Sequence, residues 1–335
     1  MIAALDGTPL TLSSGGLRRY ADELVRSLRS EFPEDEYHVV SDQLTPPRNW
    51  LERRWWSIGL PRKLVSLGCE VFHGTNFSVP YLPLRPAVMT VHDVSPWRDP
   101  AWHHDARRVR TRTPYLIGLG LATMLIVPTN AVRREVIDLF PVPPDRVAVV
   151  PEAAAPHLVP SEPYSSRPYF LFVGTLEPRK NVPALVAAWN EMRRRHDVDL
   201  ILAGRRRQDG PQFAPQDGLL LLSEVNEQDL RKLYSGAVAL VYPSFYEGFG
   251  LPLLEAMQCG TPVIASPDPA VVEVCGNAAI HTSDVARAME ALLLNTEERC
   301  RRRELSLKRA ADFSWSKTAR LTREVYVEAI RRFGY

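Results

Sequence analysis

The stretch that decides the fold is Glu247-Gly248-Phe249-Gly250-Leu251-Pro252-Leu253-Leu254-Glu255. It follows an apolar run at 238–242, which predicts a buried strand, and it leads into a predicted helix at 252–258. A glycine loop that opens a helix offers backbone N–H groups and the positive end of the helix dipole to an anion. The glutamates at both ends can accept hydrogen bonds from hydroxyl groups. The stretch therefore predicts a site for a ligand that carries both phosphate and hydroxyls.

Length and composition describe an ordinary globular protein. The 335 residues suffice for two domains, each with its own core. Lys and Arg number 41 against 39 Asp and Glu, so the net charge of +2 does not indicate a nucleic-acid partner. The four cysteines form no CxxC pair, which argues against a disulfide framework or zinc site and is consistent with a cytoplasmic location. The first residues predict a strand rather than a signal peptide, and the longest apolar stretch, 115–127, is shorter than a membrane span.

Strand-like and helical patterns alternate along the whole chain, which predicts parallel α/β architecture. A segment at 151–168, rich in proline, alanine and serine, lacks periodicity and predicts a linker between two α/β halves. Ligands of such folds bind at the carboxyl ends of the strands, so a cleft between the halves is expected. The predicted strands are 2–5, 37–41, 71–73, 88–92, 125–128, 147–150, 169–173, 200–203, 219–222, 238–242 and 262–265; the predicted helices are 17–29, 105–121, 131–139, 182–195, 252–258, 283–294, 296–310 and 315–333.

A second candidate site follows the strand predicted at 169–173, in the turn Gly174-Thr175-Leu176-Glu177-Pro178-Arg179-Lys180-Asn181. Gly174 permits a sharp turn, and Asn181 is the expected cap of the next helix. Arg179 and Lys180 then lie at a helix start, where the dipole opposes cations. A bound diphosphate explains this placement, although a solvated basic turn is the simpler alternative.

Two further candidates belong to the first half. Gly15 and Gly16, after Ser13 and Ser14, open the first predicted helix and permit close approach of a ligand, or form a plain turn capped by serine. The dinucleotide fingerprint GxGxxG is absent, which disfavours an oxidoreductase. His92 ends an apolar strand, where it faces the expected cleft or is a structural histidine.

Other motifs have simpler explanations. Asp197-Val198-Asp199 matches the DxD metal pattern but starts a strand, at the end of the sheet away from the expected cleft, so it predicts a turn. The arginine runs at 193–195 and 301–303 predict solvated helix faces, whereas 205–207 follow a strand and border the cleft. Trp55 and Trp56 follow two arginines, which suggests either peripheral contact with a membrane or a buried helix contact.

Taken together and in order, these motifs resemble the retaining glycosyltransferases of family 4, also called group 1, with the GT-B fold. The resemblance covers nearly the full length and includes Gln258-Cys259-Gly260-Thr261-Pro262-Val263-Ile264-Ala265 and Phe313-Ser314-Trp315. It implies two Rossmann-like domains whose parallel sheets face each other across a cleft: an acceptor domain at 1–155, a nucleotide-sugar domain at 165–314, and a last helix at 315–335 that crosses back to the first domain.

The resemblance also implies roles for matching residues. Glu255 accepts hydrogen bonds from ribose, Glu247 contacts the transferred sugar, and Arg179 and Lys180 hold the diphosphate. His92 lies near the reacting carbon. Many family members carry Arg directly after the first glycine of the phosphate turn, where this chain has Thr175, which leaves the second phosphate cation unassigned. The other implied donor-binding residues are Gly15, Gly16, Gly174, Val225, Phe249, Gly250 and Leu251.

The expected function is transfer of a hexose, with mannose as the expected sugar, from a GDP- or UDP-sugar to a glycan or lipid-linked acceptor. The resemblance to mannosyltransferase-type bacterial members implies polysaccharide or lipopolysaccharide synthesis, retention of anomeric configuration, and no metal or other cofactor. The expected location is cytoplasmic, with peripheral contact at the inner face of the plasma membrane as a further hypothesis. The alternatives are a sugar-nucleotide epimerase of the same fold and an inactive nucleotide-binding scaffold.

Overall fold

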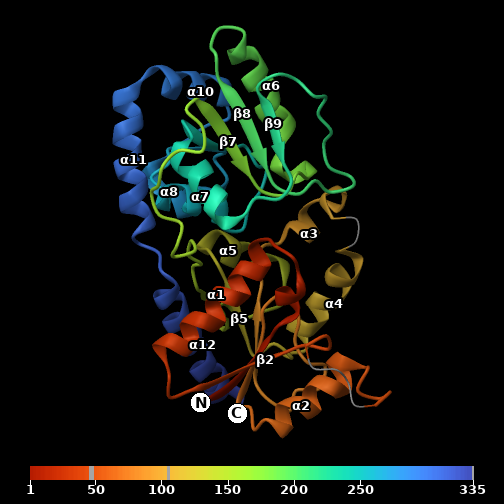
Figure 1. The fold of residues 1–335 in the computed structure, drawn as a ribbon. Helices are drawn as coiled ribbons and strands as arrows, with labels where there is room; N and C mark the ends of the chain where they lie inside the picture. The colour runs from red at the N-terminus through yellow and green to blue at the C-terminus, as the bar shows by residue number, and fades with distance from the viewer. Residues whose placement is uncertain (45–48, 104–105, 334–335) are drawn as a thin grey trace. The chain divides into compact units, whose positions relative to one another are not determined.

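The computed structural model describes residues 1–44, 49–103 and 106–333. Contacts divide the chain into two compact units, Met1–Glu152 with Ser314–Tyr335, and Ala153–Phe313. Each unit contains one six-stranded parallel sheet, as the alternation of strands and helices predicts (Figure 1).

In the first unit the strand order is β2-β1-β3-β4-β5-β6. All residues of β3, β4 and β5 are buried, because helices cover both faces of a parallel sheet. The start of the helix predicted from residue 105 lies outside the described residues. The main elements are β1 (Ile2–Asp6), α1 (Gly16–Glu31), β2 (Glu36–Val40), α2 (Leu60–Ser66), β3 (Val71–Gly74), β4 (Ala87–Thr90), α3 (Ser95–Arg98), α4 (Arg107–Gly118), β5 (Met124–Val127), α5 (Asn130–Leu139), β6 (Val147–Val149) and α12 (Trp315–Phe333).

Helix α12 returns the end of the chain to the first unit, where it lies beside α1 (Figure 1). The hydroxyl of Tyr326 on α12 lies 2.7 Å from Nδ1 of the fully buried His73 on β3. Arg323 Nε donates to Asp35 Oδ2 at 2.6 Å, and the N-terminal ammonium donates to Asp35 Oδ1 at 2.7 Å. Burial opposes ionisation of Asp35, but these donors lower the pKa of its carboxyl to about 2.

In the second unit the strand order is β12-β11-β10-β7-β8-β9. Its core includes the fully buried Trp189 of α6 and the aromatic residues of β7. The main elements are β7 (Tyr169–Val173), α6 (Val182–Arg193), β8 (Asp199–Ala203), β9 (Leu219–Leu222), α7 (Glu227–Gly236), β10 (Ala239–Tyr242), α8 (Leu251–Gln258), β11 (Val263–Ala265), α9 (Pro269–Cys275), β12 (Ala279–His281), α10 (Val285–Leu294) and α11 (Thr296–Ala310).

Five of the main elements were not predicted from the sequence: α2, α3, α7, α9 and β12. Each is short, and the apolar stripe of α7 consists of Leu230, Leu233 and Tyr234, which span little more than one helical turn. Asn181 is the N-cap residue of α6, as predicted, but its side chain does not cap the helix. Asn181 adopts the left-handed conformation with φ of 51° and donates from Nδ2 to the carbonyl of Pro243 at 3.3 Å.

The pair Trp55 and Trp56 packs inward, as the second sequence interpretation holds. Trp55 is 6% exposed, and the half-buried Trp56 packs edge-to-face on Phe72 with ring centroids 6.5 Å apart. The guanidinium of Arg112 lies 6.0 Å from the centroid of the Trp56 ring. These tryptophans therefore belong to the packing of the first unit.

Candidate functional site

The loop between β10 and α8 positions the residues of the opening motif. Gly250 is the residue before α8 and adopts the left-handed conformation, with φ of 86°. Its carbonyl accepts from the backbone N–H of Leu253 at 2.9 Å, and a Cβ at this glycine would lie 2.5 Å from Leu253 Cδ1. The loop geometry therefore requires glycine here. Phe249 and Leu251 on either side are buried, and Phe249 packs edge-to-face on Phe313 at 5.9 Å.

Glu247 is buried in this loop and lies between the two predicted phosphate-binding cations. Lys180 Nζ donates to Glu247 Oε1 at 2.6 Å, and Arg179 Nη1 donates to Oε2 at 3.1 Å. Lys180 Nζ also donates to the hydroxyl of Tyr242, at the end of β10, at 2.8 Å. The structure thus joins the turn after β7 to the loop after β10 at the carboxyl ends of neighbouring strands.

Arg179 is held on three sides by protein acceptors. Its Nε and Nη2 donate to Glu177 Oε1 at 3.2 and 2.9 Å, and its Nη1 also donates to the carbonyl of Tyr246 at 2.7 Å. The residue is 9% exposed. Arg179 therefore fixes the backbone and the carboxylate of the loop that carries Glu247.

Glu177 and Arg207 extend this network and were not among the predicted site residues. Arg207 Nη1 donates to Glu177 Oε2 at 3.1 Å, and Arg207 Nε donates to Asp209 Oδ1 at 2.8 Å. The sequence carried a partial signal, since Glu177 belongs to the phosphate turn and Arg207 to the basic run after β8. Three acids and three bases thus alternate, in the order Asp209, Arg207, Glu177, Arg179, Glu247 and Lys180.

The buried ion pair determines the charge states at its centre. Burial raises the pKa of Glu247, but Lys180 and Arg179 outweigh this effect, so the carboxyl pKa lies below its usual range. Burial and the neighbouring Arg179 lower the pKa of the Lys180 ammonium, against the opposing effect of Glu247. A buried pair of this kind stabilises the fold only while both partners are present.

The turn after β7 is fixed by close contact with the turn after β8. Gly174 N–H donates to the carbonyl of Ala203 at 2.9 Å, and Leu176 N–H donates to that of Arg205 at 2.9 Å. A Cβ at Gly204 would lie 2.0 Å from the carbonyl oxygen of Gly174. The parallel pairing of β7 with β8 thereby continues into the two turns and brings Glu177 and Arg207 within hydrogen-bond distance.

Glu255 and Val225 occupy other parts of the same unit. Glu255, on α8, is buried and accepts from the hydroxyl of Tyr234, on α7, at 2.7 Å. Val225 is half-buried, packs against the core and precedes Asn226, the N-cap of α7. The structure brings Arg179, Lys180 and Glu247 into direct contact.

The first-unit candidates lie at the carboxyl end of its sheet. His92 follows β4, rather than ending it, and its Nδ1 lies 2.9 Å from Glu152 Oε1. Its Nε2 lies 2.9 Å from the carbonyl oxygen of Thr75, and the ring packs edge-to-face on Tyr20, with centroids 4.7 Å apart. Burial lowers the pKa of His92, but the hydrogen bond to Glu152 and the negative charge of that carboxylate, together with the bond to the Thr75 carbonyl, outweigh burial and raise the pKa above its usual value.

Gly15 and Gly16 open α1 as the sequence predicts. Gly15 is the N-cap residue of α1 and has φ of 116°. Asp197 and Asp199 of the DxD pattern lie at the amino end of β8, where Arg167 pairs with both. The pattern is therefore part of a turn, as predicted.

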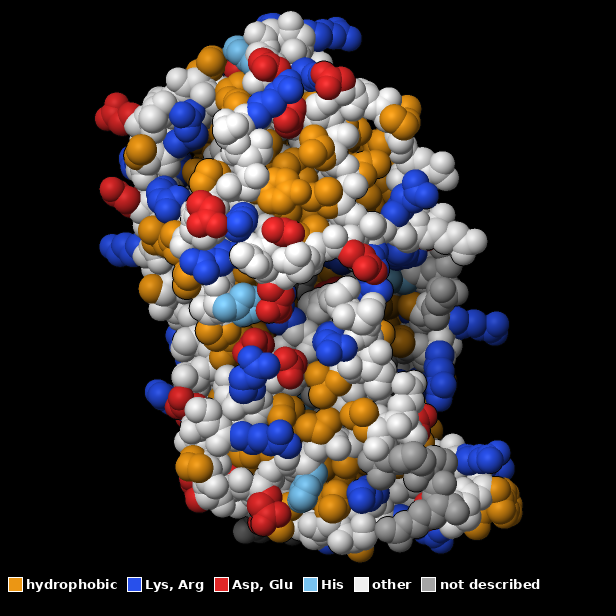
Figure 2. Space-filling view, in the orientation of Figure 1, with side chains coloured by type: hydrophobic (Ala, Val, Ile, Leu, Met, Phe, Trp, Pro, Cys, Tyr) orange, Lys and Arg blue, Asp and Glu red, His pale blue; other side chains and the backbone are white. Residues whose placement is uncertain are grey.

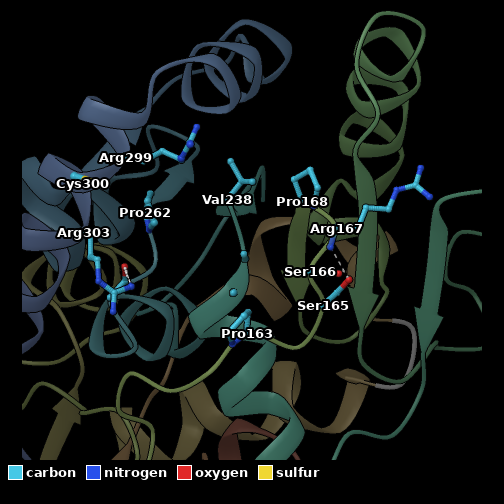
Figure 3. Close-up of a pocket in the computed structure, with 13 residues that line it drawn as sticks. Pro163, Ser165, Ser166, Arg167, Pro168, Val238, Pro262, Arg299, Cys300 and Arg303 are labelled. Atoms are coloured by element: carbon cyan, nitrogen blue, oxygen red, sulfur yellow. Dashed lines mark hydrogen bonds between the residues drawn. The ribbon is translucent and has the colours of Figure 1, made fainter.

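A pocket of about 400 Å³ lies at the opposite end of the second sheet (Figure 3). Pro168, Val238 and Pro262 line it from the residues directly before β7, β10 and β11. Arg299 and Arg303 of α11 also line it; Arg299 Nη1 donates to the carbonyls of the last turn of α10, at 2.6 Å each. None of the predicted site residues lines this pocket.

Comparisons with known proteins agree with the arrangement. The model of the family described as Glycosyltransferase Family 4 matches residues 14–158, and that described as Glycosyl transferases group 1 matches residues 158–308. The chain is 33% identical to O-antigen chain mannosyltransferase B of Escherichia coli over 76% of this chain and 74% of that protein. It is 27% identical to O-antigen chain mannosyltransferase RfbU of Salmonella typhimurium, over 75% and 71% of the two chains.

Among solved structures, sucrose-phosphate synthase of Thermosynechococcus elongatus superposes with a TM-score of 0.76 at 19% identity, over 98% of each chain. This likeness establishes the fold. Because the two family models together cover most of the sequence, the chain belongs to the group 1 glycosyltransferases of glycosyltransferase family 4, with the GT-B fold of two Rossmann-like units.

Proposed function

We propose that this glycosyltransferase moves a hexose, namely mannose, from a nucleotide-diphosphate sugar to a glycan or lipid-linked acceptor, with retention of anomeric configuration. The observation that carries the proposal is the buried Lys180, whose ammonium is held at 2.6 Å from Glu247 at the carboxyl ends of the strands. A buried ammonium beside a glycine loop at a helix start is suited to the negative charge of a diphosphate.

The proposed mechanism begins with an exchange of partners. The diphosphate takes one of the hydrogen bonds of Lys180 and also accepts from backbone N–H groups at residues 249–251. Glu247 is thereby released in part from Lys180 and accepts a hydrogen bond from a hydroxyl of the donor sugar. Arg179 stays on Glu177 and keeps the Glu247 loop in position.

Cleavage of the bond to the anomeric carbon moves negative charge onto the diphosphate and leaves positive charge on the sugar. Lys180 and the start of α8 stabilise the leaving group, which is the task a metal ion performs in metal-dependent enzymes. Glu255 accepts hydrogen bonds from the ribose hydroxyls in exchange for that of Tyr234. We therefore propose that the enzyme needs no metal or other cofactor.

Mannose and GDP are proposed because both relatives described above are named O-antigen chain mannosyltransferases. Their names also support polysaccharide or lipopolysaccharide synthesis as the setting. The epimerase and scaffold alternatives gain no support from these matches.

The experiment is a donor screen by mass spectrometry in the presence of EDTA, which follows loss of intact UDP-, GDP-, ADP- and dTDP-sugars with a polyprenyl-linked acceptor. GDP-mannose should be consumed, and the product should have the α configuration of the donor by NMR. A larger thermal shift with UDP than with GDP contradicts the donor proposal, and an inverted product contradicts retention.

A peripheral contact with a membrane is a second part of the proposal. Among the described residues, no helix is long and apolar enough to cross a bilayer. Tyr115 of α4 and the following Leu119 are 70% and 73% exposed, and Arg108 lies on the same stripe at helical spacing. The fraction of protein that floats with anionic vesicles should fall when Tyr115 and Leu119 are both replaced by serine. An unchanged fraction contradicts membrane contact through this surface. On the face in Figure 2, acidic and basic side chains are interspersed.

A further inference from the structure

His92 is placed so that both of its ring nitrogens face hydrogen-bond acceptors. Nδ1 lies 2.9 Å from a carboxylate oxygen of Glu152, and Nε2 lies 2.9 Å from the backbone carbonyl oxygen of Thr75. A carbonyl oxygen can only accept, and an ionised carboxylate can only accept. A neutral imidazole has one N–H and one lone pair, so it would direct a lone pair at one of these oxygens.

We propose that Glu152 is a positioning residue that keeps His92 as a doubly donating imidazolium, so that His92 serves the transfer as a cation and not as a base. Nδ1 donates to Glu152, and Nε2 donates to Thr75. The lone pair that a general base needs is absent in this state, since both nitrogens carry protons.

The groups around the ring favour the positive charge. Glu152 is 5% exposed and supplies the nearest carboxylate, and Asp93, next in the chain, adds a second negative charge. His73 interacts electrostatically with His92, but burial lowers the pKa of His73 to about 3, so this imidazole stays neutral. Burial raises the pKa of Tyr20 above its usual value, so this phenol is also neutral.

The charge has a structural consequence for the reaction. A histidine fixed at both nitrogens cannot rotate to abstract a proton from an acceptor hydroxyl without breaking two hydrogen bonds. It offers instead a fixed positive charge and a polarised C–H edge at the carboxyl end of the first sheet. The link to sugar transfer rests on the proposed function, whereas the protonation state of His92 does not.

The direct test is long-range ¹H–¹⁵N correlation NMR of the full chain labelled at histidine nitrogens, with His92→Gln to assign the signals. Near neutral pH, both ring nitrogens of His92 should show the shifts of protonated nitrogen. In Glu152→Gln, one nitrogen should lose its proton at lower pH than in the wild type. Glu152→Asp should restore part of the difference. Glu36→Gln, which removes an exposed carboxylate of the same unit, should leave the signals of His92 unchanged.

Kinetics provide the second readout. The wild-type kcat should fall as the pH rises through the raised pKa of His92, and in Glu152→Gln the fall should begin at lower pH, with donor KM within twofold. One unprotonated ring nitrogen in the wild type near neutral pH overturns the proposal. Two protonated nitrogens in a protein that consumes no sugar nucleotide would instead contradict only the proposed function.

Discussion

Replacement of Glu247 by glutamine should destabilise the protein much more than the same change at Glu255. Glutamine keeps the size and one acceptor oxygen, so Glu247→Gln removes the charge and leaves Lys180 and Arg179 buried beside a neutral group. Breaking a buried ion pair by removing one partner costs about 3–5 kcal/mol. Glu177 still pairs with Arg179, and Tyr242 still accepts from Lys180, so the lower end, about 3 kcal/mol, is expected.

Glu255→Gln is the matched control, because Glu247 and Glu255 are equally buried, each 5% exposed, and differ in their hydrogen-bond partners. Glu255 accepts from the neutral hydroxyl of Tyr234, which an amide oxygen can also accept, so Glu255→Gln should cost about 1 kcal/mol. Urea unfolding followed by circular dichroism gives both free energies of unfolding, and a loss of 3 kcal/mol corresponds to about 6–12 °C in Tm for a unit of this size.

A double-mutant cycle separates the charge from other effects of the change. Lys180→Gln combined with Glu247→Gln removes both charges, so the double variant should be at least about 1 kcal/mol more stable than the sum of the single losses indicates. If Glu247→Gln costs no more than Glu255→Gln, or if the two single effects are additive, the reasoning about this buried pair is refuted.

Two further predictions concern stability. Gly204→Ala should lower the free energy of unfolding by about 3 kcal/mol or more, because φ is 146° and the new Cβ would lie 2.0 Å from the backbone oxygen of Gly174. The control is Gly68→Ala, where φ is 66° and the nearest atom to the new Cβ lies at 3.8 Å. It should cost about 1 kcal/mol in the same thermal unfolding assay. The Asp35 carboxyl has its pKa lowered to about 2, so its contribution should be present above about pH 4 and lost as the pH falls toward 2. Asp35→Asn should remove about 2 kcal/mol near neutral pH and flatten the urea midpoint between pH 4 and 2; an unchanged pH profile contradicts the role of Arg323 as its partner.

The strands of both sheets were predictable because parallel strands are buried on both faces and appear as continuous apolar runs, as at Tyr169–Val173. The short helices were not, since α7 makes a core contact through three residues only and has no long periodic pattern. One boundary differs from the prediction: β4 stops at Thr90, so His92 lies in the following loop.

The sequence predicted which residues belong to the candidate site, but not which of them bond to one another. Spacing indicated that Arg179, Lys180 and Glu247 share one end of the sheet. It could not indicate that Glu177 takes two bonds from Arg179, because that choice depends on the left-handed Asn181 and on pairing of the loops after β7 and β8. Arg179 was predicted to contact phosphate directly, and its contacts place it on the loop that carries Glu247. In the proposed mechanism, Lys180 is therefore the cation that exchanges partners.

The contact of Glu152 with His92 also could not be predicted from the sequence. Glu152 lies in a segment predicted as a linker, without helical or strand period, and its partner His92 is 60 residues away in sequence. No local pattern connects two such residues. Their contact follows from parallel pairing, because β6 is hydrogen-bonded beside β5, and β5 beside β4, so that the chain after each strand emerges at the same edge of the sheet.

The most direct test of the account is the affinity of GDP and UDP for two variants of one ion pair, measured by isothermal titration calorimetry. If Lys180 holds the diphosphate and Glu247 competes for it, Lys180→Gln should weaken binding by about tenfold or more, since a hydrogen bond to a charged group contributes about 1.5–3 kcal/mol. Glu247→Gln, which disrupts the same pair but leaves the cation, should bind as tightly as the wild type or more tightly. Equal weakening in both variants, or wild-type affinity in Lys180→Gln, would contradict the assignment of this site.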